Sequence, residues 1–565
     1  MSALDRKLLR DLWRMRGQVL AIALVLAAAT ATFVLSTSVH GSLSATRDAY
    51  YARNHFGEIF AGMTRAPRSV IARLGALPGV RRVDGNIVQY ATLDLPGRVE
   101  PMRALINSVD ENGRDQLNLL TLSRGHMPRP GETGEVVIDG TFAEANGLSL
   151  GDTVMAQIYG RREPLKIVGM GFAPNYIYAL APGDLIPDDR RFGIFWMGRK
   201  GLEAVTDRRE AINAVSLTLE RGASHVEVIR KVDALLAPYG GTGAYGREDH
   251  LSHAFLDSEL KQLSAMTRVI PPVFLLVSTF LVYIVLGRMI RTERTQIGLI
   301  KAFGYSEWAI GWHYLKFALA VALLAILMGS LAGVWMGQSM TSLYARYYRF
   351  PFLDYALSPG VFLGAAALAL GSAALGALGG VRAAMMLAPA VAMSPPPPPI
   401  YRAGLVERLG QKGGFSAIGH MIVRHIARWP GRSAVTVLGI ALSLGLLFAT
   451  TQFVDSTRAV IDQFFVRGQH QDLTVTFNDP RNEDVVYALR QLPGVLRVET
   501  TRAIPVKLHL RNRSKRTAIE SSDPGATLTA RIDSSGAVVS LPPAGLVLSR
   551  QLAREMDAGP GDELL

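Results

Sequence analysis

Five long apolar runs alternate with polar stretches along this chain. Each run approaches the length of about 20 residues that a helix needs to cross the hydrocarbon core of a bilayer. The apolar core of each run contains no Asp, Glu, Lys, Arg or His, which disfavours the alternative that the runs are buried helices of a soluble core. The pattern therefore predicts five membrane-spanning helices, at residues 19–39, 268–287, 317–337, 361–381 and 434–454.

Basic residues beside these runs predict the orientation of the chain. Lys and Arg gather before the first run, between the second and third, and between the fourth and fifth. The link between the third and fourth runs carries only Arg346 and Arg349. Because basic loops stay on the cytoplasmic side, the N-terminus should be cytoplasmic in this multi-pass protein. The expected cytoplasmic segments are 1–18, 288–316 and 382–433, and the expected outer segments are 40–267, 338–360 and 455–565.

Composition places much of the chain in water, since only 49% of the residues are hydrophobic and 19% are charged. The segment 40–267 combines an alternating strand pattern over Val83–Leu95 with helical periodicity over Val226–Leu236, which predicts a mixed α/β domain. The amphipathic stretch His253–Met266 runs into the second span and is expected to form a stalk. The predicted fold class is an α-helical membrane protein with large extracytoplasmic mixed α/β domains.

Two basic cytoplasmic stretches also carry apolar faces. In segment 1–18, Leu8 and Trp13 share one face with other leucines, and a similar pattern precedes the fifth span. Such helices lie along lipid headgroups, so membrane lipids are expected partners, although a solvated basic tail is the alternative. The proline run Pro395–Pro399 is expected to form a stiff spacer between two halves of the chain. In the third span, Gly329, Gly333 and Gly337 form a ridge that is typical of close helix packing.

The two halves of the chain resemble each other. Leu77–Asp84 reads LPGVRRVD and Leu492–Glu499 reads LPGVLRVE, and two further pairs of short matches follow the same order at nearly the same offset. Several ordered matches predict an internal duplication, each copy having one span, an outer domain and three spans. The second copy is incomplete, and by comparison with the first it lacks roughly 230 residues, as in a truncated gene product or a fragment.

Between the second and third spans lies the most informative stretch, residues 291–310. Ile297, Ile300 and Lys301 share one helical face, and Gly304 follows where a helix C-terminal cap is favoured. Ser306 is placed to cap a second helix. The stretch therefore predicts two short helices joined by a tight turn, against the alternative of an ordinary cytoplasmic loop.

This stretch resembles the FtsX-like permease family, the MacB/LolC/LolE type of ABC transporter membrane subunit, in its double-repeat form. Members carry a pattern close to Arg-x-Glu-Ile-Gly-x-Leu-Lys-Ala-Leu-Gly-Ala-Ser, and here Arg294–Ser306 reads RTQIGLIKAFGYS, with Gln296 where the family usually has Glu. The resemblance implies a coupling segment that docks on a separate ABC ATP-binding subunit. The implied coupling residues are Arg294, Gln296, Ile297, Gly298, Ile300, Lys301, Gly304 and Ser306.

The resemblance also implies a function in the bacterial inner membrane. The chain would couple ATP hydrolysis by its partner to export or extraction of a hydrophobic, lipid or peptide substrate by mechanotransmission, and a periplasmic adaptor is a further candidate partner. The alternative within the family is a transmembrane signalling protein that controls an extracytoplasmic partner such as a cell-wall hydrolase. Outside the family, the chain could be a membrane-anchored enzyme or an ion-coupled carrier, and the carrier is disfavoured because the spans hold no ionisable residue.

Other chemistry is weakly signalled. The sequence contains no Walker A pattern, so no ATP cofactor of its own is expected and the chain is not expected to be an enzyme. It has no cysteine, and the pair His250 and His253 falls short of a metal ligand set, so neither a catalytic nor a metal site is expected. The net charge of +13 follows from the basic flanks of the spans, and no nucleic-acid partner is expected.

Overall fold

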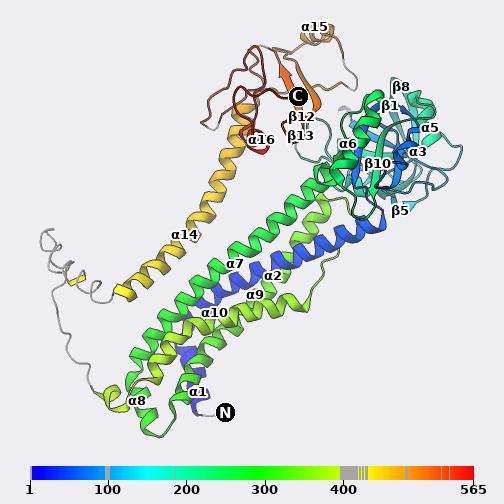
Figure 1. The fold of residues 1–565 in the computed structure, drawn as a ribbon. Coiled ribbons are helices and arrows are strands. Elements are labelled where there is room, and N and C mark those ends of the chain that lie inside the picture. The colour runs from blue at the N-terminus through cyan, green and yellow to red at the C-terminus, as the bar shows by residue number, and fades with distance from the viewer. Residues whose placement is uncertain are drawn as a thin grey trace. The chain divides into compact units, whose positions relative to one another are not determined.

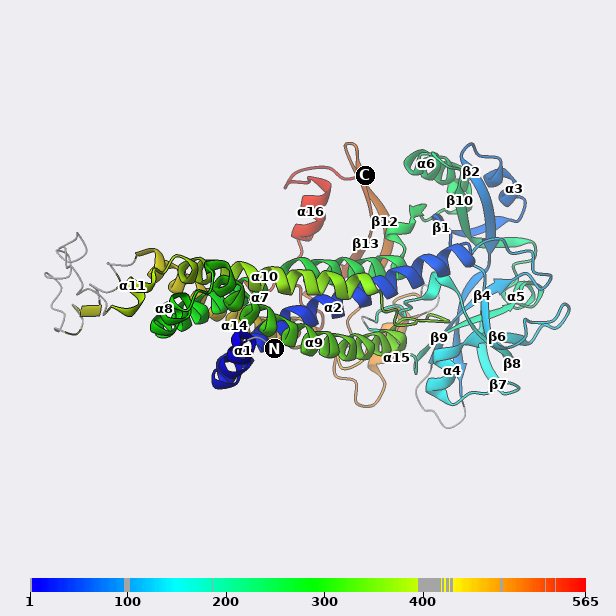
Figure 2. The ribbon, with the colours of Figure 1, turned by 90° about the horizontal axis from the view of Figure 1, so that it is seen from below.

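In the computed structural model, shown in Figures 1 and 2, two units account for the described chain. The helical unit comprises Met1–Ser44, Leu260–Ser342 and Asp354–Ser456, and the sheet unit comprises Ala45–Glu259, Leu343–Leu353 and Thr457–Leu565. The structure describes residues 3–95, 102–184, 186–394, 418, 421–422, 426, 430–477, 481–523, 525–533 and 535–565.

Long helices make up the helical unit, and four of them lie side by side in both views (Figures 1 and 2). They are α2 (Arg16–Arg53), α7 (Leu251–Thr292), α9 (Glu307–Tyr347) and α10 (Pro359–Met385). Short helices accompany them, namely α1 (Ala3–Arg14), α8 (Arg294–Ala302) and α11 (Pro389–Met393), and a further long helix is α14 (Pro430–Ile461).

Five helices in the described part of the chain are long and apolar enough to cross a membrane, and each overlaps one predicted span. The chain is therefore a membrane protein. Helix α7 continues from the amphipathic stretch His253–Met266 into the second span without a break, as the stalk prediction requires. The proline run and most of the stretch before the fifth span lie outside the described residues.

Glycines of α9 allow a close approach to α2. A Cβ atom added at Gly333 would lie 2.8 Å from Val34 Cβ and 2.9 Å from the backbone oxygen of Ala31. Gly329 is equally tight against Ala27. Two of the three residues of the predicted ridge therefore form a helix contact, whereas Gly337 faces Tyr355 in the link that follows α9.

Replacing Gly333 by valine is expected to lower the free energy of unfolding by about 1–3 kcal/mol, because the added side chain overlaps backbone atoms of α2 that cannot move aside freely. Thermal unfolding of the purified protein in a mild detergent measures the change. The matched control is Gly371→Val in α10, where no described atom lies within 4 Å. Equal midpoints for the two variants would contradict the proposed close contact.

The sheet unit contains two sheets from the first outer segment, so the mixed α/β prediction is confirmed for that segment. The larger sheet has seven strands in the order β5-β8-β6-β9-β4-β3-β7, and a further β8–β7 pairing closes six of them into a ring. The strands are β3 (Val88–Asp94), β4 (Met102–Val109), β5 (Thr121–Gly125), β6 (Glu135–Asp139), β7 (Thr153–Ile158), β8 (Arg161–Phe172) and β9 (Phe192–Gly198). Helix α4 (Gly140–Asn146) connects β6 to β7, and the 3-10 turn η1 (Pro174–Tyr176) lies between β8 and β9. Helix α5 (Arg199–Thr206) follows β9 and leads to the smaller sheet.

The smaller sheet has four antiparallel strands in the order β11-β1-β10-β2. Its strands are β1 (Ile59–Pro67), β2 (Val80–Asn86), β10 (Ala211–Leu219) and β11 (Tyr245–Gly246), and its helices are α3 (Val70–Gly75) and α6 (His225–Leu236). The strand pattern over Val83–Leu95 falls on two strands, because the chain passes from β2 in this sheet to β3 in the larger sheet at Ile87. Burial alternates in β3, where Ala91 and Leu93 are buried and their neighbours are more exposed.

The segment after α14 contains the hairpin β12 (Thr501–Leu510) and β13 (Arg513–Ser522), with helices α15 (Asp484–Arg490) and α16 (Arg550–Met556). Its local geometry agrees with that of the first copy at two matched turns. Gly79 and Gly494 have φ of 92° and 89°, and Gly151 and Gly561 both have φ of 95°. These angles favour glycine over any other residue. The duplication stays a prediction to which these turns add support.

Candidate functional site

The stretch singled out by its sequence forms a helix, a turn and the start of a second helix at one end of the helical unit (Figure 1). Helix α8 is closed at its C-terminus by Gly304, whose φ is 90° and whose N–H donates to Lys301 O at 3.0 Å. The N–H of Ala309 donates to Ser306 Oγ at 3.2 Å, so Ser306 caps the following helix as predicted. That helix is not short. It is α9, which runs for 41 residues through the third span.

The helical face predicted to contact a partner is turned toward the protein itself. Ile297 is 1% exposed and belongs to the apolar core, against which Ile300 also packs. The Lys301 side chain is 5% exposed, and its Nζ donates to Met385 O at 2.6 Å and to Leu387 O at 2.8 Å. These two carbonyls lie at the C-terminal end of α10, where helical oxygens lack intrahelical donors. Lys301 therefore fixes α8 to the end of α10.

Contacts with α11 hold the other side of α8. Arg294 donates a hydrogen bond to Val391 O, and a Cβ added at Gly298 would lie 2.8 Å from Ala392 Cβ. Of the predicted coupling residues, the structure thus assigns Arg294, Ile297, Gly298, Ile300 and Lys301 to internal packing. Gln296, Gly304 and Ser306 remain exposed.

Large apolar side chains that the motif did not single out face outward from the same segment. We call Leu299, Phe303, Tyr305 and Trp308 the exposed turn cluster. Phe303 is 76% exposed and Trp308 is 72% exposed. Burying one such side chain stabilises a contact by about 1.5–3 kcal/mol. The presence of several large apolar residues in a basic cytoplasmic segment could have indicated this surface from the sequence. The family pattern instead led to the face with Ile297, Ile300 and Lys301.

A buried cluster of charges joins α1 to the junction of α7 and α8. Lys7 Nζ lies 2.5 Å from Asp11 Oδ2 and 2.7 Å from Glu293 Oε2, and the hydroxyl of Tyr314 donates to Glu293 Oε2 at 3.0 Å. His313 Nε2 lies 4.0 Å from Asp11 Oδ2. Glu293 is the residue that separates α7 from α8, with φ −94° and ψ 12°. This cluster therefore sets the position at which α8 begins.

The orientation of α1 corrects the sequence interpretation. The Arg and Lys residues of this amphipathic helix were expected to lie opposite its leucines, yet Lys7 is buried, as is Asp11. Leu8 packs against the core, whereas Leu9 and Trp13 are exposed. The partner of Lys7 is Glu293, far along the chain, so periodicity within α1 alone gives no sign of it.

Within the part of the chain that the structure describes, no group of three or more His, Cys, Asp and Glu side chains is placed to hold a metal ion. His250 packs among aromatic rings, 4.5 Å from the Phe60 ring and 5.4 Å from the Phe56 ring between centroids. Burial lowers the pKa of His250 to about 3, so this side chain is neutral near pH 7.

Comparisons with known proteins find one matching family model and several similar solved structures. Residues 268–389, which include α8, match the family described as FtsX-like permease C-terminal. Comparison with curated proteins gives no match. One similar solved structure is the extracellular domain of the noncanonic ABC-type transporter YknZ from Gram-positive bacteria, with 15% identity, 33% of this chain and 97% of that chain covered, and a TM-score of 0.23. Another is the periplasmic region of MacB from Actinobacillus actinomycetemcomitans, with 10% identity, 36% and 92% covered, and a TM-score of 0.24.

Proposed function

From the premise that residues 268–389 form an FtsX-like permease C-terminal domain, we propose that this chain is the membrane subunit of an ABC transporter, driven by a separate ATP-binding subunit. The chain itself is not the enzyme in this proposal. Its work is to pass a conformational change through its helices to the large domain on the other side of the membrane. The family resemblance favours export or extraction of a hydrophobic, lipid or peptide substrate.

The observation that carries the proposal is the exposed turn cluster between two long helices. Leu299, Phe303, Tyr305 and Trp308 lie within ten residues of chain and are all exposed. A contiguous group of large apolar side chains at the end of a helix bundle is typical of a protein docking surface. We assign this surface to the ATP-binding subunit, and we reassign Ile297 and Lys301 from the docking contact to the support of α8.

Support for α8 on three sides makes it suited to transmit force. Lys301 fixes it to the end of α10, Arg294 to α11, and the neighbouring Glu293 to α1. The turn at Gly304 then leads directly into α9, which spans the membrane as one helix. A displacement of the docked turn would therefore move α9 along with α8, because only residues 303–306 separate the two helices.

Replacing Phe303 by aspartate is expected to reduce co-purification of the ATP-binding subunit at least about tenfold, since losing the burial of one large apolar side chain costs more than about 1.4 kcal/mol. Trp308→Asp should act in the same direction. The measurement is quantitative recovery of the partner with the full-length protein in a mild detergent.

The matched control for these variants is Ile186→Asp, which introduces the same charge at an apolar position of the sheet unit that is 63% exposed. It should leave recovery of the partner unchanged. If Phe303→Asp and Trp308→Asp also retained the partner at the wild-type level, the proposed docking surface would be refuted.

A further inference from the structure

We propose that the outward face of α1 binds anionic phospholipid at the membrane surface beside the first span. Only Met15 separates α1 (Ala3–Arg14) from α2 (Arg16–Arg53), which contains that span. Trp13 stands six residues before Val19, where the predicted span begins, and this corresponds to about 9 Å of helical rise. One headgroup layer is about 5–8 Å thick, so the outward face of α1 lies near the headgroups. The proposal rests on the membrane spans and does not depend on the proposed ATP-binding partner.

Contacts on the inner face of α1 fix its rotation about its own axis. Leu8, Leu12 and Met15 pack against the apolar core of the helical unit. Lys7 Nζ lies 2.7 Å from Glu293 Oε2, and both side chains are nearly inaccessible to water. The opposite face is therefore presented in one orientation, and binding there need not order the helix at the cost of conformational entropy.

Two rows of side chains make up the outward face of α1. Arg6, Arg10 and Arg14, which we call the arginine row, recur every fourth residue and are all exposed. Leu9 and Trp13 form the neighbouring row and are 56% and 73% exposed. Residues four apart lie one above the other on a helix, so the two rows run side by side along α1. This combination suits an interfacial helix, because basic groups reach the phosphates while apolar side chains enter the boundary with the acyl chains.

The positive charges of the arginine row are not neutralised within the described part of the chain. The acidic residues of α1 are Asp5 and Asp11, which pair with Lys316 at 2.9 Å and with Lys7 at 2.5 Å. No described carboxylate forms an ion pair with the arginine row. Anionic phospholipids carry the complementary charge, and several basic residues beside a span are typical of a site for such lipids.

The exposed surface of the first span begins shortly after Trp13, which favours lipid over a protein partner for this face. Leu20 and Leu24 are the next large apolar side chains to be exposed, at 48% and 49%. Leu20 follows Trp13 by about two helical turns. Between them, the Arg16 guanidinium lies 5.5 Å from the centroid of the Trp13 ring. Exposed apolar side chains within a span meet acyl chains, so the outward face of α1 adjoins lipid along the chain.

The test titrates the full-length protein in a mild detergent with phosphatidylglycerol or with phosphatidylcholine of the same chain length, and native mass spectrometry counts the lipids retained. The wild type should bind phosphatidylglycerol more tightly. Combining Arg6→Gln, Arg10→Gln and Arg14→Gln should weaken the first phosphatidylglycerol bound at least about tenfold, since each basic residue near anionic headgroups contributes about fivefold. Binding of phosphatidylcholine should change by less than about twofold. Lysine at the same three positions keeps the charges and should preserve binding.

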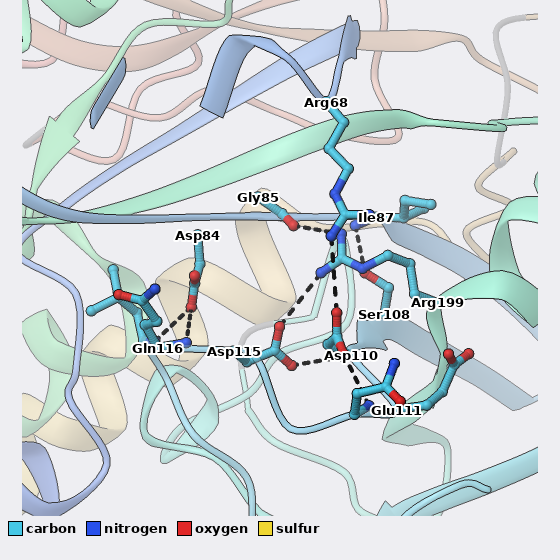
Figure 3. A network of polar contacts seen from close by, with 12 residues as sticks. Arg68, Asp84, Gly85, Ile87, Ser108, Asp110, Glu111, Asp115, Gln116 and Arg199 are labelled. Carbon is cyan, nitrogen blue, oxygen red and sulfur yellow. Dashed lines mark hydrogen bonds and ion pairs between the residues drawn. The ribbon is translucent and has the colours of Figure 1, made fainter. Parts of the chain in front are cut away.

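The charge-matched control combines Arg68→Gln, Arg81→Gln and Arg162→Gln in the sheet unit. Arg68 Nη2 lies 3.9 Å from Asp110 Oδ2, as Figure 3 shows, so this charge already has a partner within the chain. The control should bind phosphatidylglycerol as the wild type does. Thermal unfolding without added lipid checks the fold of the glutamine variant of the arginine row, and we expect no shift because its three side chains are exposed.

The proposal is overturned if the glutamine variant binds phosphatidylglycerol at the wild-type level, or if the control loses as much binding. It is also overturned if the glutamine variant keeps the lipid but loses the ATP-binding subunit, since the outward face of α1 would then contact protein. Absence of any ATP-binding subunit from the wild-type preparation would leave the lipid measurement unaffected, so the two proposals fail separately.

Discussion

Replacing Lys7 by methionine is expected to lower the free energy of unfolding by about 3–5 kcal/mol, which is the cost of removing one partner from a buried ion pair. Lys7 is the cation that lies against both Asp11 and Glu293, and all three side chains are nearly inaccessible to water. Methionine matches the length of the lysine stem but leaves two buried carboxylates without that cation. In the variant, Glu293 would keep the neutral hydroxyl of Tyr314 as a hydrogen-bond donor, and Tyr314 does not contact Asp11 in this way.

Thermal unfolding in a mild detergent measures this loss. The control is Lys316→Met, because Lys316 and Asp5 form a 2.9 Å pair in the same unit that stays about one third exposed on both sides. Exposed pairs contribute about 0–1 kcal/mol, so this variant should unfold near the wild-type temperature. Similar midpoints for Lys7→Met and Lys316→Met would contradict a buried charge cluster at the start of α8.

Replacing Arg349 by methionine is expected to destabilise the sheet unit by about 3–5 kcal/mol, and by more at high pH than at low pH. Arg349 Nε lies 2.8 Å from Asp139 Oδ2, and Arg349 Nη2 lies 2.5 Å from Asp189 Oδ1. Asp139 is 1% exposed and also caps α4 through the N–H of Thr141. Without Arg349 its carboxylate is buried with no facing cation.

The pH dependence follows from the pKa of Asp139. Burial raises this pKa and Arg349 opposes the rise, so removal of Arg349 raises it further. Between the ordinary pKa of an aspartate and this raised value, the folded state binds more protons than the unfolded state. Stability therefore falls as the pH rises through that window and is recovered as Asp139 becomes protonated.

Unfolding midpoints of Arg349→Met at about pH 5 and about pH 8, each relative to the wild type, test this dependence. The difference from the wild type should be larger at the higher pH. Arg162→Met is the control, since Arg162 pairs with Asp94 on the surface of the same unit and both side chains are more than half exposed. A loss for Arg349→Met that is small or independent of pH would show that Asp139 is not held by Arg349.

The parts of this fold that were predicted from the sequence are those with local signals. Apolar runs of sufficient length predicted the spans, and the local sequence predicted the cap at Ser306 and the C-terminal cap at Gly304, whose φ is 90°. One predicted helix length was wrong. The helix after Ser306 was expected to be short, but it is continuous with the third span. The start of α9 before the third span mixes Glu307, His313 and Lys316 with apolar and aromatic residues, so the predicted span began only at Phe317.

What the sequence did not reveal depends on contacts between distant residues. The amphipathic face of α8 was recognised, but whether Ile297 and Lys301 meet a partner or the protein itself depends on the end of α10 more than 80 residues away. The burial of Lys7 depends likewise on Glu293.

The most direct test of the central proposal is purification of the full-length protein from its own cell membranes in a mild detergent, with identification of every co-purifying chain and an assay of ATP hydrolysis. We expect a second chain with a Walker A motif and ATP hydrolysis that depends on it, because this chain has no such motif. A preparation that consistently lacks any nucleotide-binding partner and any ATP hydrolysis would contradict the account.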